Sequence, residues 1–134
     1  GGNAFDAAIA IAATLNVVEP MMSGIGGYGT ILIYDAGEKK VKFLNPSGRF
    51  PLASNSDLMR PPTPNYKENR TGPKSISTPG NLNAWEDMHA KYGSKEWGSL
   101  FDPAISHAEN GFRISEQNDK NYCECRYWQY QRRQ

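Results

Sequence analysis

The first apolar segment of the chain, residues 4–15, has the pattern of a buried helix. Almost every residue in it is apolar and favours helix, and only Asp6 and Thr14 are polar. Asn3 can cap the start, and Asp6 follows three residues later, where a carboxylate suits a helix N-terminus. Because apolar surface wraps most of the way round, we expect this helix to lie between layers of a body larger than this chain.

A β-hairpin is predicted after a glycine-rich loop at residues 23–29. Residues 30–35 form an apolar, β-branched run that is typical of a strand buried on both faces. Residues 36–39 supply a turn, and residues 40–45 alternate between polar and apolar side chains as a second strand does. The two strands should therefore pair antiparallel.

The second half of the chain predicts one long irregular segment and two helices. Residues 46–79 hold most of the prolines and few aliphatic side chains, so they should form an irregular excursion. Helices follow over residues 80–91 and 99–110, and Gly93 and Gly111 stand just past their ends. We expect Leu82, Trp85 and Met88 on the inner face of the first, and Phe101, Ile105 and Ala108 on that of the second.

Length and composition are typical of one soluble globular domain. The chain has 134 residues, of which 38% are hydrophobic and 22% are charged, with a formal net charge of +1. These values exclude a disordered chain and give no indication of nucleic-acid binding. The longest apolar stretch, residues 7–18, falls well short of the roughly 20 residues that span a bilayer, so we expect no membrane span.

The composition changes abruptly near the C-terminus. Residues 116–134 contain no Ala, Val, Ile, Leu or Met, although they include three tyrosines, a tryptophan and two cysteines. A divergent surface tail, an appended remnant or a shifted reading frame would each account for this break. Cys123 and Cys125 lack the further ligands that a metal site needs, so no metal is predicted. We therefore place a boundary at residue 115, with 116–134 outside the fold.

The glycine-rich loop matches a nucleotide-binding pattern by its letters alone. Residues 24–29 read GIGGYG, which fits G-x-G-x-x-G. That motif requires a strand before the glycines and a helix after them, because the pyrophosphate lies on the helix N-terminus. Here a helix precedes and a strand follows. Glycines that let backbones turn or pack closely are the favoured explanation, and a glycine-loop nucleotide-binding module is kept as an alternative.

No catalytic triad can be assembled from the residues present. His89 and His107 fall on the polar sides of their predicted helices, where a solvated histidine is the usual case. Glu19, beside the glycine-rich loop, could act in catalysis or could equally bond to N–H groups of the loop. Arg49 follows the second strand in a turn flanked by glycine and proline; it could grip a carboxylate through two parallel hydrogen bonds or be a solvated surface residue.

Five blocks of sequence, in order, resemble one family. The first two are GGNAFDAAIA and VVEPMMSGIGGYGTILIYDA, and the others are KVKFLNPSGRFPLAS, STPGNLNAWEDMHAKYG and LFDPAISHAENGF. Together they cover residues 1–115 and resemble the large subunit of the γ-glutamyltranspeptidases. The resemblance implies an α+β fold, namely a fragment of the four-layer αββα sandwich of N-terminal-nucleophile hydrolases.

The resemblance also implies a reaction and a partner. In the family, a threonine at the start of a small subunit attacks the γ-glutamyl carbonyl of glutathione-type amides, and its free amine acts as base. None of the threonines here has the family's Thr-x-His context, so no catalytic residue is assigned and this chain alone should be inactive. The implied partners are the small catalytic subunit, the γ-glutamyl substrate, and water or an amino acid as acceptor; no cofactor is implied.

Arg49 is the one residue to which the resemblance assigns a function. In the family, an arginine in the matching turn binds the α-carboxylate of the substrate, and Arg49 is the arginine of that turn. A gapless alignment, however, places Ser47 in the arginine column. An arginine two places later, as at Arg49, suits the γ-glutamyltransferase-like branch and leaves the substrate open. Many members are periplasmic or extracellular and some are cytoplasmic, so the compartment also stays open. A non-catalytic truncated or frameshifted relic is the remaining alternative.

Overall fold

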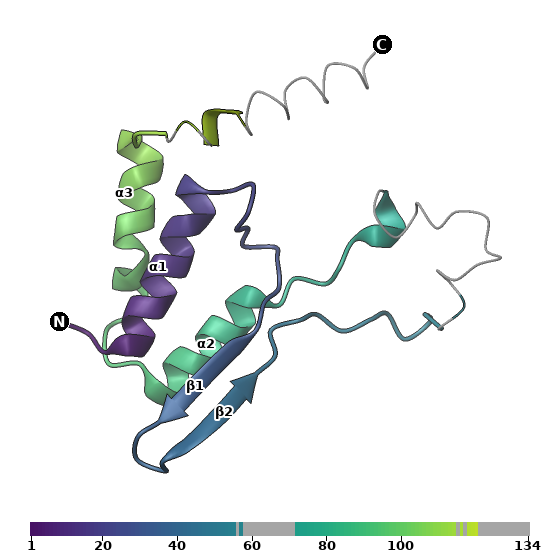
Figure 1. The fold of residues 1–134 in the computed structure, drawn as a ribbon, viewed down its shortest axis with the longest axis horizontal. Coiled ribbons are helices and arrows are strands. Elements are labelled where there is room, and N and C mark those ends of the chain that lie inside the picture. The colour runs from purple at the N-terminus through teal and green to yellow at the C-terminus, as the bar shows by residue number, and fades with distance from the viewer. Residues whose placement is uncertain (56, 58–71, 115, 117, 121–134) are drawn as a thin grey trace. The chain divides into compact units, whose positions relative to one another are not determined.

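The computed structural model describes residues 1–55, 57, 72–114, 116 and 118–120. Most of the 116–134 segment, with both cysteines, lies outside these residues. The chain divides into two compact units, which are described separately: Gly1–Ile25 with Trp85–Gln134, and Gly26–Ala84. Figure 1 labels the helices and strands. In chain order the elements are α1 (Ala4–Val18), β1 (Ile31–Asp35), β2 (Lys40–Leu44), η2 (Pro73–Ser75), α2 (Asn81–Tyr92), η3 (Gly98–Phe101) and α3 (Asp102–Asn110).

Helix α1 begins with the cap that its sequence predicts. The Asn3 side chain accepts hydrogen bonds from the backbone N–H groups of Phe5 (2.9 Å) and Asp6 (3.1 Å). In return, the Asp6 carboxylate accepts the Asn3 N–H at 2.8 Å, which completes a capping box. The helix continues to Val18, three residues past its predicted end, and the Glu19 N–H closes it on the Leu15 carbonyl at 2.8 Å.

The first unit is built on the packing of α1 against η3 and α3, and Figure 1 shows α1 and α3 side by side. Ile9 is fully buried and Ala13 is 5% exposed, and Leu100 and Ala104 are equally well covered. Ile11, two positions after Ile9, is 60% exposed. Within this chain, α1 therefore buries only one stripe of its surface. The predicted position between two layers would require protein outside this chain to cover the exposed side of the helix.

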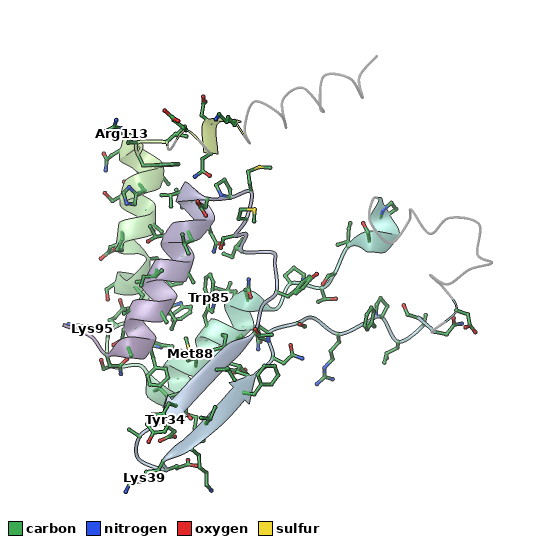
Figure 2. The ribbon with its side chains drawn as sticks, in the orientation of Figure 1. Tyr34, Lys39, Trp85, Met88, Lys95 and Arg113 are labelled. Atoms are coloured by element: carbon green, nitrogen blue, oxygen red, sulfur yellow. The ribbon has the colours of Figure 1, made fainter. Side chains whose placement is uncertain are left out.

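The inner face of the last helix is shifted from the predicted one. Ile105 is 49% exposed and Ala108 is exposed, whereas Leu100 and Ala104 are buried, so the predicted face is wrong. The reason is local: residues Gly98–Phe101 form a 3-10 turn, with about three residues per turn, before the α-helix starts at Asp102. That turn rotates the side chains that follow. In α2, Trp85 and Met88, which Figure 2 labels, are buried as predicted, but Leu82 is 45% exposed.

The second unit contains the predicted hairpin. β1 and β2 pair antiparallel, with Leu32 opposite Phe43 and Tyr34 opposite Val41. At the turn, one Asp35 carboxylate oxygen accepts the N–H groups of Gly37 and Glu38 at 3.1 Å each, and the other bonds to Lys42 Nζ at 2.8 Å. Figure 2 labels Tyr34 on β1 and Lys39 at the turn.

The expectation that β1 is buried on both faces is wrong for this chain. Ile33 is 6% exposed, but its neighbours Leu32 and Tyr34 are 74% and 63% exposed. Their partners on β2, Phe43 and Val41, are similarly exposed at 62% and 68%. Because cross-strand partners share a face, these four side chains form one exposed apolar face of the hairpin, which we call the outer hairpin face.

Candidate functional site

Arg49 lies on the wall of a cavity of about 750 Å³ in the second unit. The lining comes from two stretches of chain, within residues 47–55 and 73–78, together with Tyr28 of the glycine-rich loop. Arg49 is exposed, so its guanidinium is accessible to a ligand. The cavity has the size of ordinary small-molecule sites. Side chains with a hydroxyl or amide make up much of the lining: Ser47, Ser54, Asn55, Ser75, Ser77 and Thr78.

The charge distribution in this cavity is simple. Among the described residues that line it, Arg49 is the only charged one. Phe50 and Ile76 add apolar surface and are 89% and 76% exposed. A guanidinium can bind one carboxylate through two parallel N–H···O hydrogen bonds, and no acidic side chain of the described lining competes for it. The cavity therefore suits a ligand that joins one anionic group to an uncharged, partly apolar portion.

The turn that carries Arg49 is joined to the opposite wall of the cavity. The Thr78 hydroxyl donates a hydrogen bond to the backbone carbonyl of Arg49 at 3.2 Å. The two residues are 29 positions apart, and no sequence pattern within residues 73–78 predicts this contact. The turn residues marked Arg49 as a candidate, whereas nothing in the sequence indicated the wall that faces it.

The helix and strand on either side of the glycine-rich loop come in the order that argues against a nucleotide site. α1 precedes it and β1 follows it, as predicted. The Gly27 carbonyl accepts the Gly80 N–H at 3.4 Å. A Cβ built on Gly29 would lie 3.8 Å from the Asn81 side-chain oxygen. At these two glycines, the loop lies against the start of α2, which supports close packing as the role of glycine here.

Asp6 makes contacts that its position in the helix cap did not predict. It is 3% exposed, and its carboxylate accepts hydrogen bonds from the Ser94 hydroxyl (2.5 Å), the Ser94 N–H (3.0 Å) and the Lys95 N–H (3.3 Å). The hydrogen bond from the Ser94 hydroxyl lowers the pKa of Asp6 most, and the bonds from the backbone N–H groups of Asn3, Ser94 and Lys95 lower it further. The pKa of Asp6 therefore lies well below its usual range. Every donor is a structural group of the chain, so Asp6 joins the start of α1 to the segment after α2 and is no catalytic candidate.

The remaining titratable candidates also have structural contacts. A ring nitrogen of His89 lies 2.8 Å from the Lys95 carbonyl, and the ring centre lies 5.2 Å from that of Trp97, so the half-buried His89 has contacts within the chain that the sequence did not predict. His107 packs against Phe112 at 6.2 Å between ring centres. The Glu19 carboxylate lies 3.4 Å from the Asn118 side-chain nitrogen.

Within the described residues, the His, Asp and Glu side chains form no group of three or more that could hold a metal ion. Among the helices formed by the described part of the chain, none has the length and hydropathy needed to cross a membrane.

Comparison with known proteins identifies one family. The sequence profile described as gamma-glutamyltranspeptidase matches residues 1–127. The glutathione hydrolase proenzyme of Bacillus subtilis (strain 168) is 38% identical over 117 residues, which cover 85% of this chain and 20% of that protein. Glutathione hydrolase 5 proenzyme of Rattus norvegicus is 34% identical over 113 residues, again 20% of its length. The chain thus spans about a fifth of the curated relatives it matches.

Solved structures agree with the sequence match. The gamma-glutamyltranspeptidase of Helicobacter pylori superposes with a TM-score of 0.83 at 36% identity, over 95% of this chain and 37% of that one. The enzyme from Pseudomonas nitroreducens gives 0.80 at 31% identity, over 93% of this chain and 37% of that one. The profile match extends past residue 115, while the proposed boundary there stays a prediction because most of the following segment lies outside the described residues. The chain belongs to the gamma-glutamyltranspeptidase family.

Proposed function

We propose that this chain is a large-subunit portion of an enzyme that hydrolyses or transfers γ-glutamyl groups. Its relatives are named glutathione hydrolase proenzymes, which supports a precursor that is processed into two subunits. The nucleophile is an N-terminal threonine on the small subunit: its hydroxyl attacks the γ-glutamyl carbonyl, its amine takes the proton, and water or an amine then releases the acyl group. This chain alone carries no catalytic residue and is inactive.

The role of Arg49 is to bind the α-carboxylate of the substrate. The observation that carries this proposal is its place as the single charge among the described lining of the 750 Å³ cavity. Ser47, which takes the arginine column in a gapless alignment, also lines this cavity. Either residue can therefore reach a ligand there, but only Arg49 supplies the positive charge that a carboxylate requires.

The proposal also includes the fold of the whole enzyme, which is a four-layer αββα sandwich. The outer hairpin face supports it, because four large apolar side chains on one face of two strands need a cover of similar character. A second sheet contributed by the rest of the enzyme would provide that cover. Residues 1–115 would belong to this sandwich and residues 116–134 would lie outside it.

The test of Arg49 uses the longer protein that contains this chain and two substrates with the same leaving group. γ-Glutamyl-p-nitroanilide carries the α-carboxylate, and 4-aminobutyryl-p-nitroanilide lacks it. Arg49→Ala should raise KM for the first by about tenfold to a hundredfold, because a hydrogen bond to a charged group contributes roughly 1.5–3 kcal/mol. KM for the second should not change. Arg113→Ala, at an exposed arginine of the other unit, is the matched control.

Two results would each contradict one part of this proposal. Unchanged kinetics in Arg49→Ala would take Arg49 out of the site. Release of p-nitroaniline by the 134-residue chain alone would show that its nucleophile lies within it. The relic alternative is tested at the locus: an in-frame threonine in a Thr-x-His context downstream supports an enzyme, and its absence from every frame supports a relic.

A further inference from the structure

Two segments of backbone lie unusually close at the cavity wall that carries Arg49. A Cβ built on Gly48 would overlap the carbonyl oxygen of Thr78. A Cβ built on Gly80 would overlap the carbonyl oxygen of Pro46. Residue 48 thus faces residue 78 while residue 46 faces residue 80, so the two segments run antiparallel with a reciprocal pair of contacts.

This pairing is specific to the residues present. Any side chain at Gly48 or Gly80 would strike backbone on the other segment, which cannot move aside as the end of a flexible side chain can. Pro46 and Pro79 have no N–H, so the pairing cannot be completed by ladder hydrogen bonds at those positions. The Thr78 hydroxyl supplies a cross-segment hydrogen bond instead, and its acceptor is the carbonyl of Arg49 itself.

We propose that the segment Thr78 to Gly80 positions Arg49 for binding the substrate carboxylate. The proposal rests on the function proposed for Arg49 above. The contact at Gly48 and the hydrogen bond at Arg49 fix two consecutive residues of the turn, and they leave the guanidinium as the part of Arg49 free to meet a ligand. Two hydrogen bonds to one carboxylate require a fixed direction of approach, so a loosely held turn would bind it poorly. Thr78, Gly48 and Gly80 are positioning residues and touch no reacting atom.

The kinetic test compares Thr78→Val with Thr78→Ser in the longer protein. Thr78→Val keeps the shape and loses the hydroxyl, so KM for γ-glutamyl-p-nitroanilide should rise about fivefold, the effect of one lost hydrogen bond. Thr78→Ser keeps the hydroxyl and should restore the parent value. KM for 4-aminobutyryl-p-nitroanilide, and kcat for both substrates, should stay unchanged, because Thr78 acts only on binding of the carboxylate. A merely structural defect would instead change the kinetic parameters of both substrates alike.

Glycine variants test the close approach of the two segments. Gly48→Ala should raise KM for the carboxylate substrate by more than Thr78→Val does. Gly37→Ala in the hairpin turn is the matched control, since its Cβ would meet the Asp35 carboxylate at 3.4 Å, an ordinary van der Waals distance. If Gly48→Ala prevents folding, the Thr78 pair still decides the matter.

A double-mutant cycle separates this inference from the function on which it rests. If Thr78 acts through Arg49, Thr78→Val should have no further effect in an Arg49→Ala background. Additive effects, or no effect of Thr78→Val beside a clear effect of Arg49→Ala, would overturn the positioning role alone. An Arg49→Ala variant with parent kinetics would instead overturn the function proposed for Arg49.

A measurement without turnover tests the contact in the 134-residue chain itself. In a ¹⁵N-labelled chain, Thr78→Val should shift the backbone amide resonances of Arg49 and Phe50 and leave those of the hairpin turn at Gly37 and Glu38 unmoved. Thr78→Ser should leave both sets close to their parent positions. Unmoved Arg49 and Phe50 resonances in Thr78→Val would overturn the inference.

Discussion

The packing of α1 gives a sharp test, because it carries two isoleucines in contrasting surroundings. Ile9 is fully buried where α1 packs on α3 and η3, whereas Ile11 is 60% exposed on the same helix. Replacing each with alanine removes the same atoms from the same element. The difference between the two variants therefore isolates the effect of burial.

The expected losses follow from these exposures. Ile9→Ala removes a fully buried side chain and leaves a cavity, which lowers the free energy of unfolding by about 2–5 kcal/mol. Ile11 buries about two-fifths of its surface, so its loss is about two-fifths of the roughly 1.5–3 kcal/mol for a fully buried side chain, or about 0.6–1.2 kcal/mol. A few tenths of each loss are offset because alanine favours helix more than isoleucine does. Ile9→Val should cost about 0.5–1.5 kcal/mol.

Urea unfolding of the 134-residue chain measures these differences. The buried Trp85, which is 6% exposed, reports loss of packing by its fluorescence, and far-ultraviolet circular dichroism reports loss of helix. The order of stability should be parent, then Ile11→Ala, then Ile9→Ala. Equal losses at the two positions, or no cooperative transition in the parent, would refute the packing of α1 described above.

Two further predictions concern Asp6 and the outer hairpin face. The pKa of Asp6 is lowered in the folded chain, so its contribution to stability is complete above the unfolded value of about 3.9 and is lost as pH falls below it. Asp6→Asn should therefore be less stable than the parent at pH 7, and its unfolding midpoint should depend less on pH below about 4 than that of the parent does. If the parent and Asp6→Asn have the same midpoint at pH 7 and the same dependence below about pH 4, this prediction is wrong. Phe43→Lys should lower the free energy of unfolding of the 134-residue chain by no more than about 1.2 kcal/mol, because Phe43 is 62% exposed and buries about as large a fraction of its surface as Ile11 does. The same variant should prevent the longer protein from accumulating in folded form. Normal accumulation of that variant would count against the proposed sandwich.

The elements that the sequence predicted correctly depend on short-range interactions. The cap of α1 lies within four residues of chain, and the turn of the hairpin is closed by Asp35 on Gly37 and Glu38. Local polar groups and turn chemistry decide such features wherever the segment is placed. The glycine and proline neighbours of Arg49 likewise marked its turn as a candidate site from local sequence, and the role of Arg49 stays a prediction.

What the sequence could not determine are the contacts between distant residues and the burial of whole faces. Asp6 was predicted as a cap, but its bonds to Ser94 cross 88 positions, and the Thr78 contact to Arg49 crosses 29. The apolar run of β1 predicted two buried faces, yet the residues of this chain cover only one. Periodicity records which side chains favour burial, whereas burial itself requires a partner surface, and only the tertiary structure shows which surfaces have one.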